Sequence, residues 1–385
     1  MKVDLVYFDA GGGHRAAALA LQAACRLQQR PWQVELVHLV DLVDPQGLFQ
    51  RCLGMAPEDL YNKRLARGWT LGLAQELKLL QGLIRMAHGL LCQRLAGHWR
   101  ARRPDCVVSL IPNFNRALGE SLAQALPGVP FVTVMTDMAD HPPHFWREDG
   151  IAQHLVCGTP HALAQARAAG HDPRRLHAVE GVPLHPDFHA PLALDRQAAR
   201  RALGLPAHDG QGPPVGAVMF GGAGSMAMER IARALPDTPL ILLCGRHARL
   251  AERLRRQPAA APRVVLGFTR EVRRHLALAD FFIGKPGPAS LSEALLTGLP
   301  VVTTRNAFTM PQERYNTHWL EQQGMGLVLP GFGEVGPAVR DLAAALPAYR
   351  ARVAGFRNRA VLELPDRIAG VMAAAADARH LRLAA

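Results

Sequence analysis

The sequence contains few aromatic residues, few lysines and no apolar segment of membrane-spanning length. Aromatic residues make up 6% of its 385 positions, and only 4 of its 44 basic residues are lysines. No uncharged apolar run reaches the roughly 18 residues that a transmembrane helix needs. No apolar leader precedes the first expected strand at Val3, so we expect no signal peptide. These absences predict a cytoplasmic protein that does not cross a membrane.

The cysteines offer neither a disulfide framework nor a metal site. The six cysteines are scattered, and no two of them form a C-x-x-C pair. We therefore expect reduced thiols, as is usual in the cytosol. His141 and His144 follow Asp137 closely, but they lack the H-x-x-x-H spacing of a helical zinc site and have no cysteine partner. The sequence thus predicts no bound metal.

The positive charge is concentrated in one segment. The formal net charge is +12, and residues 48–103 contain ten basic residues and three acidic ones. The segment also carries Trp69 and Trp99, with an apolar stripe at helical spacing made of Leu73, Leu77, Leu80, Ile84, Ala87, Leu91 and Leu95. A basic amphipathic helix of this kind is typical of binding to an anionic membrane surface. The alternative is that the stripe packs against the protein's own sheet.

Nucleic acid is the other usual partner of a basic protein. The sequence contains no recognised nucleic-acid-binding motif, and its aromatic and basic residues do not alternate regularly. Its bias toward arginine, alanine and proline is typical of a GC-rich bacterial genome, so arginine abundance says little about function. We expect no nucleic-acid partner.

Apolar runs alternate with helical stretches along the whole chain, which predicts an α/β protein with parallel sheets. The expected strands are 3–8, 34–39, 106–111, 131–136, 154–157, 177–179, 215–220, 239–244, 264–267, 281–283 and 301–304. A proline-rich seam at 186–214 contains one short helix, 195–203, with Asp195 as its N-cap. We therefore expect two Rossmann-like domains facing across a cleft, 1–185 and 186–346, with helices 347–385 crossing back to the first.

The stretch from Gly284 to Leu295 predicts a phosphate-binding loop. It follows an apolar strand and opens a helix, so its small residues Gly287, Ala289 and Ser290 can bring backbone N–H groups close to an anion. Glu293 lies one helical turn after Ser290, where its carboxylate can reach a sugar diol. Lys285, one of the few lysines, begins the loop. A phosphate cradle beside a diol acceptor suits a nucleotide, although an ordinary strand-to-helix turn has the same outline.

A second glycine loop, Gly11-Gly12-Gly13-His14, follows the first expected strand. Its spacing is not the G-x-G-x-x-G of a dinucleotide fold, and Asp41 lies further along than a ribose contact requires. His14 instead places a titratable imidazole at the end of a strand. Histidine can act as a general base near neutral pH.

Three further groups of polar or small residues follow expected strands. Thr136-Asp137 ends a strand and precedes His141 and His144, a set that can do acid–base chemistry. Residues 221–225 form another glycine loop that suits an anion. Residues 311–316 place amide and carboxylate groups where the hydroxyls of a sugar can be held.

Together these motifs resemble the two-domain GT-B glycosyltransferases, especially the monogalactosyldiacylglycerol synthases, and more distantly the lipid-linked N-acetylglucosaminyltransferase of peptidoglycan synthesis. The resemblance covers about residues 3–330. It rests, in order, on residues 11–16, Thr136-Asp137 with His141-Pro142 and Trp146, Gly181-Val182-Pro183 with Pro186 and Phe188, residues 221–224 and 244–246, Gly267-Phe268, residues 285–288 and 292–294, and Gln312-Glu313 with Asn316.

The resemblance implies an inverting hexosyltransferase that moves galactose or glucose from a UDP-sugar to a lipid acceptor such as diacylglycerol. Such an enzyme needs no cofactor besides its UDP-sugar substrate and no metal. It acts as a peripheral protein on the inner face of the cell membrane. The alternatives are transfer to a soluble acceptor, epimerisation of a nucleotide sugar on the same fold, or binding without catalysis.

The resemblance also implies roles for individual residues. His14 is the expected base, with Asp137 as the second candidate or as the group that orients it. The expected donor-binding residues are Gly221, Gly222, Ser225, Phe268, Lys285, Gly287, Ala289, Ser290, Glu293, Gln312 and Glu313. The expected acceptor-binding residues are Gly12, Gly13, His141 and Trp146. The chain departs from the galactolipid synthases at residues 111–115, 305–311 and 314–315, so the hexose and the acceptor both stay open.

Overall fold

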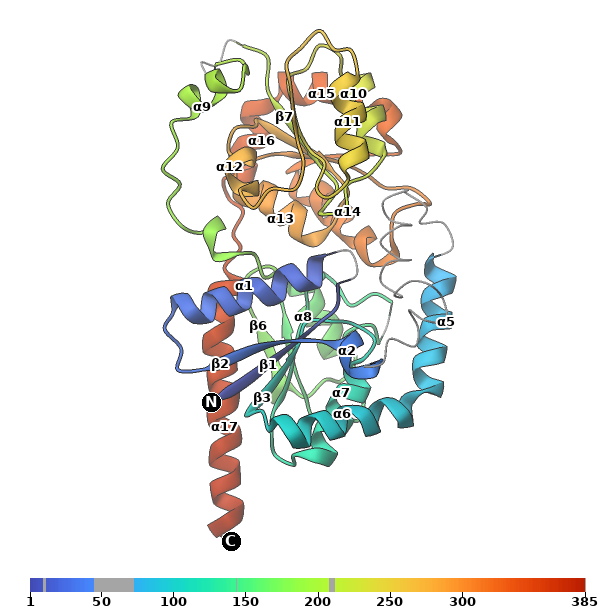
Figure 1. Cartoon of the computed structure of the whole chain (residues 1–385), viewed down its shortest axis with the longest axis vertical. Coiled ribbons are helices and arrows are strands. Elements are labelled where there is room, and N and C mark those ends of the chain that lie inside the picture. Colours follow the sequence, from blue (N-terminus) through green and yellow to red (C-terminus); the bar gives the residue numbers. More distant parts are fainter. Residues whose placement is uncertain (10–11, 45–72, 143, 208–211, 385) are drawn as a thin grey trace. The chain divides into compact units, whose positions relative to one another are not determined.

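The computed structural model describes residues 1–9, 12–44, 73–142, 144–207 and 212–384 (Figure 1). The chain divides into two compact units. Among the described residues, unit 1 contains those up to Pro186 and again those from Arg359, and unit 2 contains Asp187–Asn358. Each unit is built on its own sheet.

The sheet of unit 1 has six parallel strands in the order β2-β1-β3-β4-β5-β6. The strands are β1 (Lys2–Tyr7), β2 (Gln33–His38), β3 (Cys106–Ser109), β4 (Phe131–Val134), β5 (Gln153–Cys157) and β6 (Leu176–Ala178). The strand order reverses between β1 and β3. In doubly wound sheets, ligands bind outside the carboxyl ends of the strands at such a reversal.

Helices cover both faces of this sheet. They are α1 (Gly13–Leu27), α2 (Leu39–Val43), α5 (Leu73–Met86), α6 (His88–Arg102), α7 (Asn115–Ala125), α8 (Pro160–Ala168) and α17 (Ala360–Ala384), with 3-10 turns at Pro173–Arg175 and Pro186–Phe188. The core on one face joins α1 and α17 to the strands, and the core on the other face joins α6 and α7 to them.

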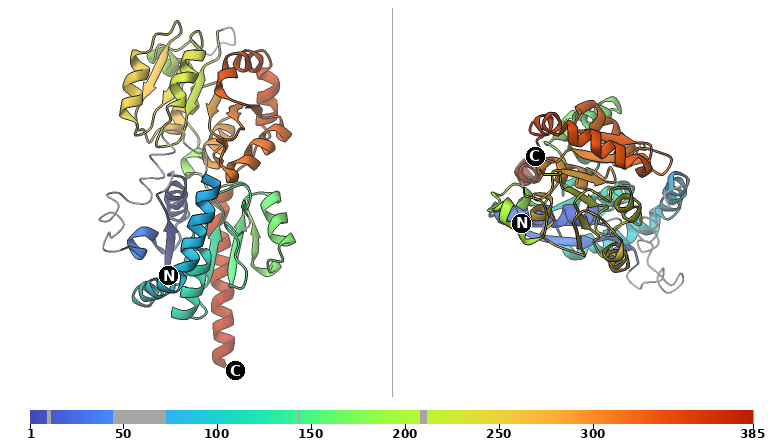
Figure 2. Two further views of the ribbon diagram at one scale, coloured as in Figure 1. Left: turned by 90° about the vertical axis from the view of Figure 1, so that its right-hand side faces the viewer. Right: turned by 90° about the horizontal axis from the view of Figure 1, so that it is seen from above.

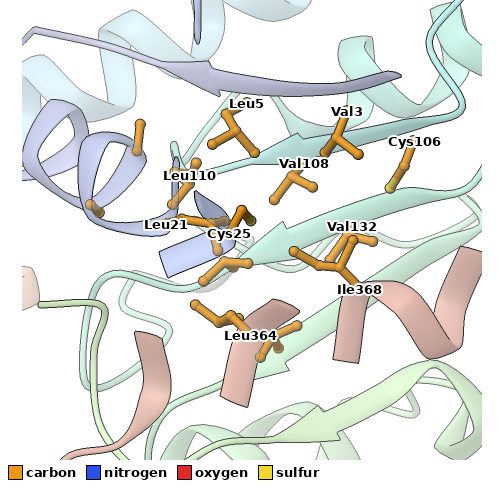
Figure 3. Close-up of a cluster of buried hydrophobic side chains, with 14 of the residues drawn as sticks. Val3, Leu5, Leu21, Cys25, Cys106, Val108, Leu110, Val132, Leu364 and Ile368 are labelled. Atoms are coloured by element: carbon orange, nitrogen blue, oxygen red, sulfur yellow. The ribbon is translucent and has the colours of Figure 1, made fainter. Parts of the chain in front are cut away.

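The last helix completes the first core. Figure 3 shows Leu21 and Cys25 of α1 and Leu364 and Ile368 of α17 meeting side chains of β1, β3 and β4, among them Val108. These side chains are almost completely buried. Burial of apolar surface is the main favourable term in folding, so α17 is an integral part of unit 1 although about 170 residues of unit 2 precede it in the chain.

The sheet of unit 2 also has six parallel strands, in the order β12-β11-β10-β7-β8-β9. Figure 2 shows the strands and helices of unit 2 from two further directions, coloured from yellow-green to orange-red. The strands are β7 (Gly216–Met219), β8 (Leu240–Leu243), β9 (Arg263–Leu266), β10 (Phe281–Gly284), β11 (Val301–Thr304) and β12 (Gly326–Leu329). The strand order reverses between β7 and β10. Because both sheets are parallel and helices connect their strands, the sequence prediction of two parallel α/β domains is confirmed.

The helices of unit 2 are α9 (Arg196–Ala202), α10 (Ala227–Ala234), α11 (Ala248–Arg256), α12 (Val272–Leu276), α13 (Pro288–Leu296), α14 (Pro311–Gln323), α15 (Val335–Ala344) and α16 (Leu346–Val353), with a 3-10 turn at Phe332–Glu334. The carboxylate of Asp195 caps α9 by accepting a hydrogen bond from Ala198 N at 2.9 Å, as the sequence predicts. Leu346 and Tyr349 of α16 pack on the core of unit 2, so the chain returns to unit 1 only at Arg359.

Two further observations compare with the sequence predictions. Each expected strand is present within a residue or two of its expected bounds, but β12 was not predicted. Among the helices that the structure describes, none combines the length and apolar character that crossing a bilayer requires.

Candidate functional site

The loops that follow β7 and β10 are neighbours in unit 2. These two strands pair in parallel, so their carboxyl ends lie at one edge of the sheet. Gly221 and Gly222 follow β7, and Lys285 and Gly287 follow β10. The structure therefore brings two of the predicted anion-binding loops together at the point where the strand order reverses.

The loop after β8 packs directly on the loop after β7. The backbone N–H of Arg246 donates a hydrogen bond to Gly222 O at 2.8 Å. Gly245 has a φ of +58°, and a Cβ atom there would lie 2.3 Å from Gly222 O. Only glycine allows this backbone approach without strain. Ser225, another predicted donor residue, is buried beside the start of α10.

The first turn of α14 is tied to the loop after β10. Lys285 Nζ lies 2.8 Å from Glu313 Oε1, and Asn316 Nδ2 donates to Pro286 O at 2.8 Å. Glu313 is almost fully buried, so its carboxylate holds the lysine rather than facing solvent. Gln312, the other residue expected to hold the hexose, stands beside it and is partly exposed.

The N-terminus of α13 follows directly from this loop. Gly287 is its N-cap, Pro288 occupies the first helical position, and no side chain caps the helix. Ala289 and Ser290 lie in the first turn, where backbone N–H groups have no partner within the helix. The helix dipole and the ammonium of Lys285 both make this corner favourable for an anion.

Glu293 lies on α13 one turn further along. Its residue surface is partly accessible, but its carboxyl group is recessed among protein atoms, and this burial raises its pKa to about 7. A carboxyl group with this pKa exists in both protonation states near neutral pH. It can therefore either donate or accept a hydrogen bond with a diol.

Replacement of Glu293 by glutamine is expected to raise the melting temperature at about pH 8 by roughly 2–4 °C, with a smaller gain as the pH falls. The folded protein keeps this proton up to about pH 7, whereas the unfolded chain releases it near 4.5. The folded state is thus penalised increasingly between these pH values and fully above them. Thermal unfolding from about pH 5 to 8 measures the effect, with the exposed Glu271→Gln as control. An equal gain at every pH would contradict the assignment.

Phe268 follows β9 and is exposed, with 58% of its surface accessible. The guanidinium carbon of Arg246 lies 5.1 Å from the centre of its ring. An exposed aromatic ring held by an arginine is a suitable platform for a planar base. The sequence predicted Phe268 as a site residue. It did not predict the role of Arg246, because a contact between the ends of two strands requires the sheet order.

His14 and Thr136 come together in unit 1. His14 lies in the first turn of α1, after Gly12, whose φ of +76° suits glycine. His14 Nδ1 and Thr136 Oγ1 are 3.2 Å apart, a hydrogen bond between the start of α1 and the end of β4. When the hydroxyl accepts the Nδ1 proton, Nε2 is the basic nitrogen of the ring. The sequence analysis named Thr136 as the neighbour of Asp137 but predicted no role for it.

Asp137 is almost fully buried, and its Oδ2 accepts a hydrogen bond from Trp146 Nε1 at 2.9 Å. Trp146 itself is fully buried and its ring centre lies 6.0 Å from that of His14. The prediction that Trp146 contacts the acceptor is therefore wrong, because the indole is enclosed and serves to hold Asp137. His141 and Gly13 are exposed, as contact with an acceptor requires. Gly11 lies outside the described residues.

The predicted membrane-facing stripe is only partly exposed. Leu91, Leu95 and Trp99 are buried against the sheet, and Trp99 Nε1 donates to Ser121 Oγ at 3.0 Å, so the prediction that this tryptophan lies at a membrane surface is wrong. Leu80 of the stripe is exposed, and so are four apolar side chains of α5 and α6 outside the stripe: Leu79, Leu83, Met86 and Leu90. We call the five exposed side chains Leu79, Leu80, Leu83, Met86 and Leu90 the apolar patch. Trp69 lies outside the described residues.

Proteins that the chain resembles in sequence or in fold include galactolipid synthases, other glycosyltransferases and a sugar-nucleotide epimerase. No protein-family model matches the sequence. A probable monogalactosyldiacylglycerol synthase 2 of Oryza sativa subsp. japonica is 28% identical over 84% of this chain and 70% of its own length. Monogalactosyldiacylglycerol synthase 1 of Arabidopsis thaliana is 25% identical over 88% of this chain and 64% of its own length. The chain thus resembles these synthases over most of its length and spans about two thirds of theirs.

Solved structures share the fold. MurG of Acinetobacter baumannii superposes with a TM-score of 0.59 at 16% identity, covering 96% of this chain and 100% of that one. A UDP-GlcNAc 2-epimerase of Neisseria meningitidis superposes with a TM-score of 0.56 at 11% identity, covering 97% and 99%. The chain therefore has the two-domain architecture called GT-B.

Proposed function

We propose that the protein is a UDP-sugar-dependent hexosyltransferase that transfers galactose to a lipid acceptor, diacylglycerol, with inversion at the anomeric carbon. The main support is the corner formed by Lys285, Gly287 and the N-terminus of α13, with Glu293 one turn away. This corner offers positive charge for a diphosphate and a carboxyl group for a ribose diol. The similarity to plant monogalactosyldiacylglycerol synthases supports galactose as the sugar and a lipid as the acceptor.

The donor is assigned to unit 2. Gly221, Gly222 and Ser225 would approach one phosphate, and Gly287, Ala289 and Ser290 the other. Phe268 would stack on uracil, with Glu293 on the ribose and Gln312 on the hexose. The structural neighbour from Neisseria meningitidis was solved with UDP-GlcNAc, which supports UDP as the nucleotide on this fold. Glu313 would act by holding Lys285 beside the phosphates.

The transfer would be a single displacement. His14 Nε2 removes the proton from the acceptor hydroxyl, and the oxygen forms a bond to the anomeric carbon as the bond from that carbon to the UDP oxygen breaks. The electron pair of the broken bond leaves on UDP. Lys285 and the N–H groups of α13 stabilise the charge that develops there. Attack opposite the leaving group inverts the anomeric centre, and Asp137 is the second candidate for the base.

The acceptor would be reached at a membrane surface, through the apolar patch. Leu79, Leu83 and Met86 recur at intervals of four and three residues, which places them on one face of α5. Met86 is 85% exposed, and the exposed Arg85 stands beside it. Apolar side chains flanked by arginine suit the headgroup region of an anionic leaflet. This would make the protein peripheral on the inner face of the cell membrane.

The double variant Leu83→Glu, Met86→Glu is expected to bind anionic vesicles at least about 100-fold more weakly. Each apolar side chain that enters the membrane contributes about 1.5–3 kcal/mol, and each new carboxylate is repelled by the leaflet. Sedimentation with vesicles that contain an anionic lipid measures the effect. Leu27→Glu, at a leucine of similar exposure on α1, is the control and should bind normally. Equal loss in both variants would show that charge alone matters, and no loss would remove the patch from the proposal.

The decisive experiment is to measure UDP release from UDP-galactose and from UDP-glucose, with and without vesicles that contain diacylglycerol and an anionic lipid. The proposal predicts release that depends on diacylglycerol, is faster with UDP-galactose and gives a β-linked product from the α-linked donor. Conversion of one UDP-sugar into another without UDP release would instead indicate an epimerase. Release with a soluble alcohol but not with vesicles would overturn the lipid acceptor.

A further inference from the structure

Three side chains of the kinds that bind transition metals meet between α6 and α7. His88 and Cys92 are four residues apart on α6 and so lie on one face of that helix. Glu120 approaches them from α7. None of the three belongs to the donor residues of unit 2 or to the group around His14, and the proposed transfer does not use them.

The three donor atoms converge on one small region. His88 Nε2 is 2.7 Å from Glu120 Oε2 and 3.4 Å from Cys92 Sγ, and all three atoms lie within 4.8 Å of one another. Around a tetrahedral zinc ion with bonds of about 2.0–2.3 Å, pairs of ligand atoms are about 3.3–3.6 Å apart. The nitrogen-to-sulfur distance already has this value. A small rotation of the partly exposed Glu120 side chain would open the remaining space.

The arrangement does not suit a catalytic relay. In a nucleophile–histidine–carboxylate relay, the nucleophile and the carboxylate bind different nitrogens of the ring. Here the thiol of Cys92 and the carboxylate of Glu120 both face Nε2 of His88. Convergence of three ligand types on one point is what a bound cation requires.

A further residue orients the carboxylate. Arg116 Nη1 donates to Glu120 Oε1 at 3.4 Å, which leaves Oε2 directed at His88. Arg116 is itself held, since its Nη2 donates to Asp149 O at 3.0 Å and its Nε lies 3.6 Å from Glu148 Oε2. Metal ligands are commonly fixed by such outer contacts.

We propose that His88, Cys92 and Glu120 form a binding site for a divalent transition metal ion, with Zn²⁺ as the ion their chemistry favours. Imidazole, thiolate and carboxylate are the three ligand types that zinc takes in proteins. On binding, the Cys92 thiol loses its proton to solvent, and the thiolate and the carboxylate together balance the two positive charges. The side chains of His88 and Glu120 are 28% and 33% exposed, so the ion can enter and a water molecule can fill the fourth position.

The sequence did not reveal this site. The expectation of no metal was drawn from scattered cysteines and from the histidines near Asp137. Here one cysteine and one histidine share a helical face, and their third partner lies 28 residues after Cys92 on the next described helix, α7. The bound ion would connect α6 to α7.

Titration of the metal-free, full-length protein with Co²⁺ and with Zn²⁺ tests the site. The wild-type protein should bind about one equivalent of Co²⁺ with the thiolate-to-cobalt charge-transfer band of a cysteine ligand, and Zn²⁺ should displace it. Cys92→Ser should lose the band. Glu120→Gln should keep the fold and bind Zn²⁺ at least about 100-fold more weakly. Cys25→Ala, at a buried cysteine in the other core of unit 1, is the matched control and should bind as the wild type does.

Two results would overturn the inference. The first is a wild-type protein with no thiolate band at one equivalent of Co²⁺. The second is a Glu120→Gln variant that binds Zn²⁺ as tightly as the wild type. Either would leave an ordinary histidine–glutamate pair beside a buried thiol. Circular dichroism of each metal-free variant checks its fold, and if Cys92→Ser is misfolded, Glu120→Gln decides. UDP release is not needed for any of these readouts, so this site and the proposed transfer stand or fall separately.

Discussion

Replacement of His14 by alanine is expected to lower the rate of lipid-dependent UDP release by about 10²–10⁴-fold, while the affinity for UDP stays unchanged. The imidazole lies in the first turn of α1, and its Nδ1 is bound to Thr136. This contact fixes the ring, and Nε2 is the proton acceptor when the Thr136 hydroxyl accepts the Nδ1 proton. The donor is assigned to unit 2, which lacks this residue. Single-turnover kinetics give the chemical rate, and calorimetry with UDP gives the affinity.

Three further variants separate the possible roles. Thr136→Val should lower the rate by about 10-fold, because the ring loses its positioning contact. Asp137→Asn should cost less than His14→Ala if histidine is the base. A larger loss for Asp137→Asn would make the carboxylate the base. His318→Ala, at an exposed histidine on α14, is the control and should be fully active.

Replacement of Gly245 by alanine is expected to lower the free energy of unfolding by about 3–4 kcal/mol and to weaken UDP binding at least about 100-fold. The new methyl group would lie 2.3 Å from Gly222 O and 2.7 Å from Gly222 C, both backbone atoms that no side-chain rotation can move. The loops after β7 and β8 would have to separate. Urea unfolding and calorimetry with UDP measure the two effects.

Gly298→Ala is the matched control for this variant. Gly298 has a φ of +87°, but no atom lies within 4 Å of the position of a new Cβ. Alanine at this position should lower the free energy of unfolding by only about 1–2 kcal/mol, the cost of a left-handed backbone conformation. It should leave the affinity for UDP unchanged. The difference between the two variants isolates the close approach of the two loops. Equal effects on stability and binding would mean that this approach does not shape the nucleotide loops.

The sheets could be predicted because half of their described strands are short, apolar and buried at every position. β7, β8, β10 and β11 are buried at every position, so each reads as an apolar run bounded by turn residues. β12 differs, because three of its four residues are only partly buried and it lies at the edge of the sheet. Such a segment, Gly326–Leu329, carries little hydrophobic contrast with the helix and loop around it.

The site could be predicted loop by loop but not contact by contact. Residue types at strand ends indicated His14, Asp137, Lys285 and Glu293, since parallel strands end at one edge. The His14–Thr136 contact joins residues 122 positions apart, and only the strand order brings them together. The predictions for Trp99 and Trp146 were wrong for a related reason. An indole can lie at a surface or donate to a buried acceptor, as Trp146 does to Asp137, and the sequence does not show which acceptor is near.

The position of α17 has a consequence for synthesis of the protein. Among the described residues, unit 2 is the continuous stretch Asp187–Asn358, so all its strands leave the ribosome before α17 does. Until residues beyond 359 have emerged, unit 1 lacks Leu364 and Ile368, and the sheet face that α1 shares with α17 is only partly covered. During translation, unit 2 can thus reach its final packing while unit 1 is still incomplete. Part of the apolar face of the unit 1 sheet is then accessible to chaperones. A nascent chain that ends at Asn358 and is joined to the ribosome by a linker that fills the exit tunnel should therefore contain a protease-resistant unit 2 and a protease-sensitive unit 1.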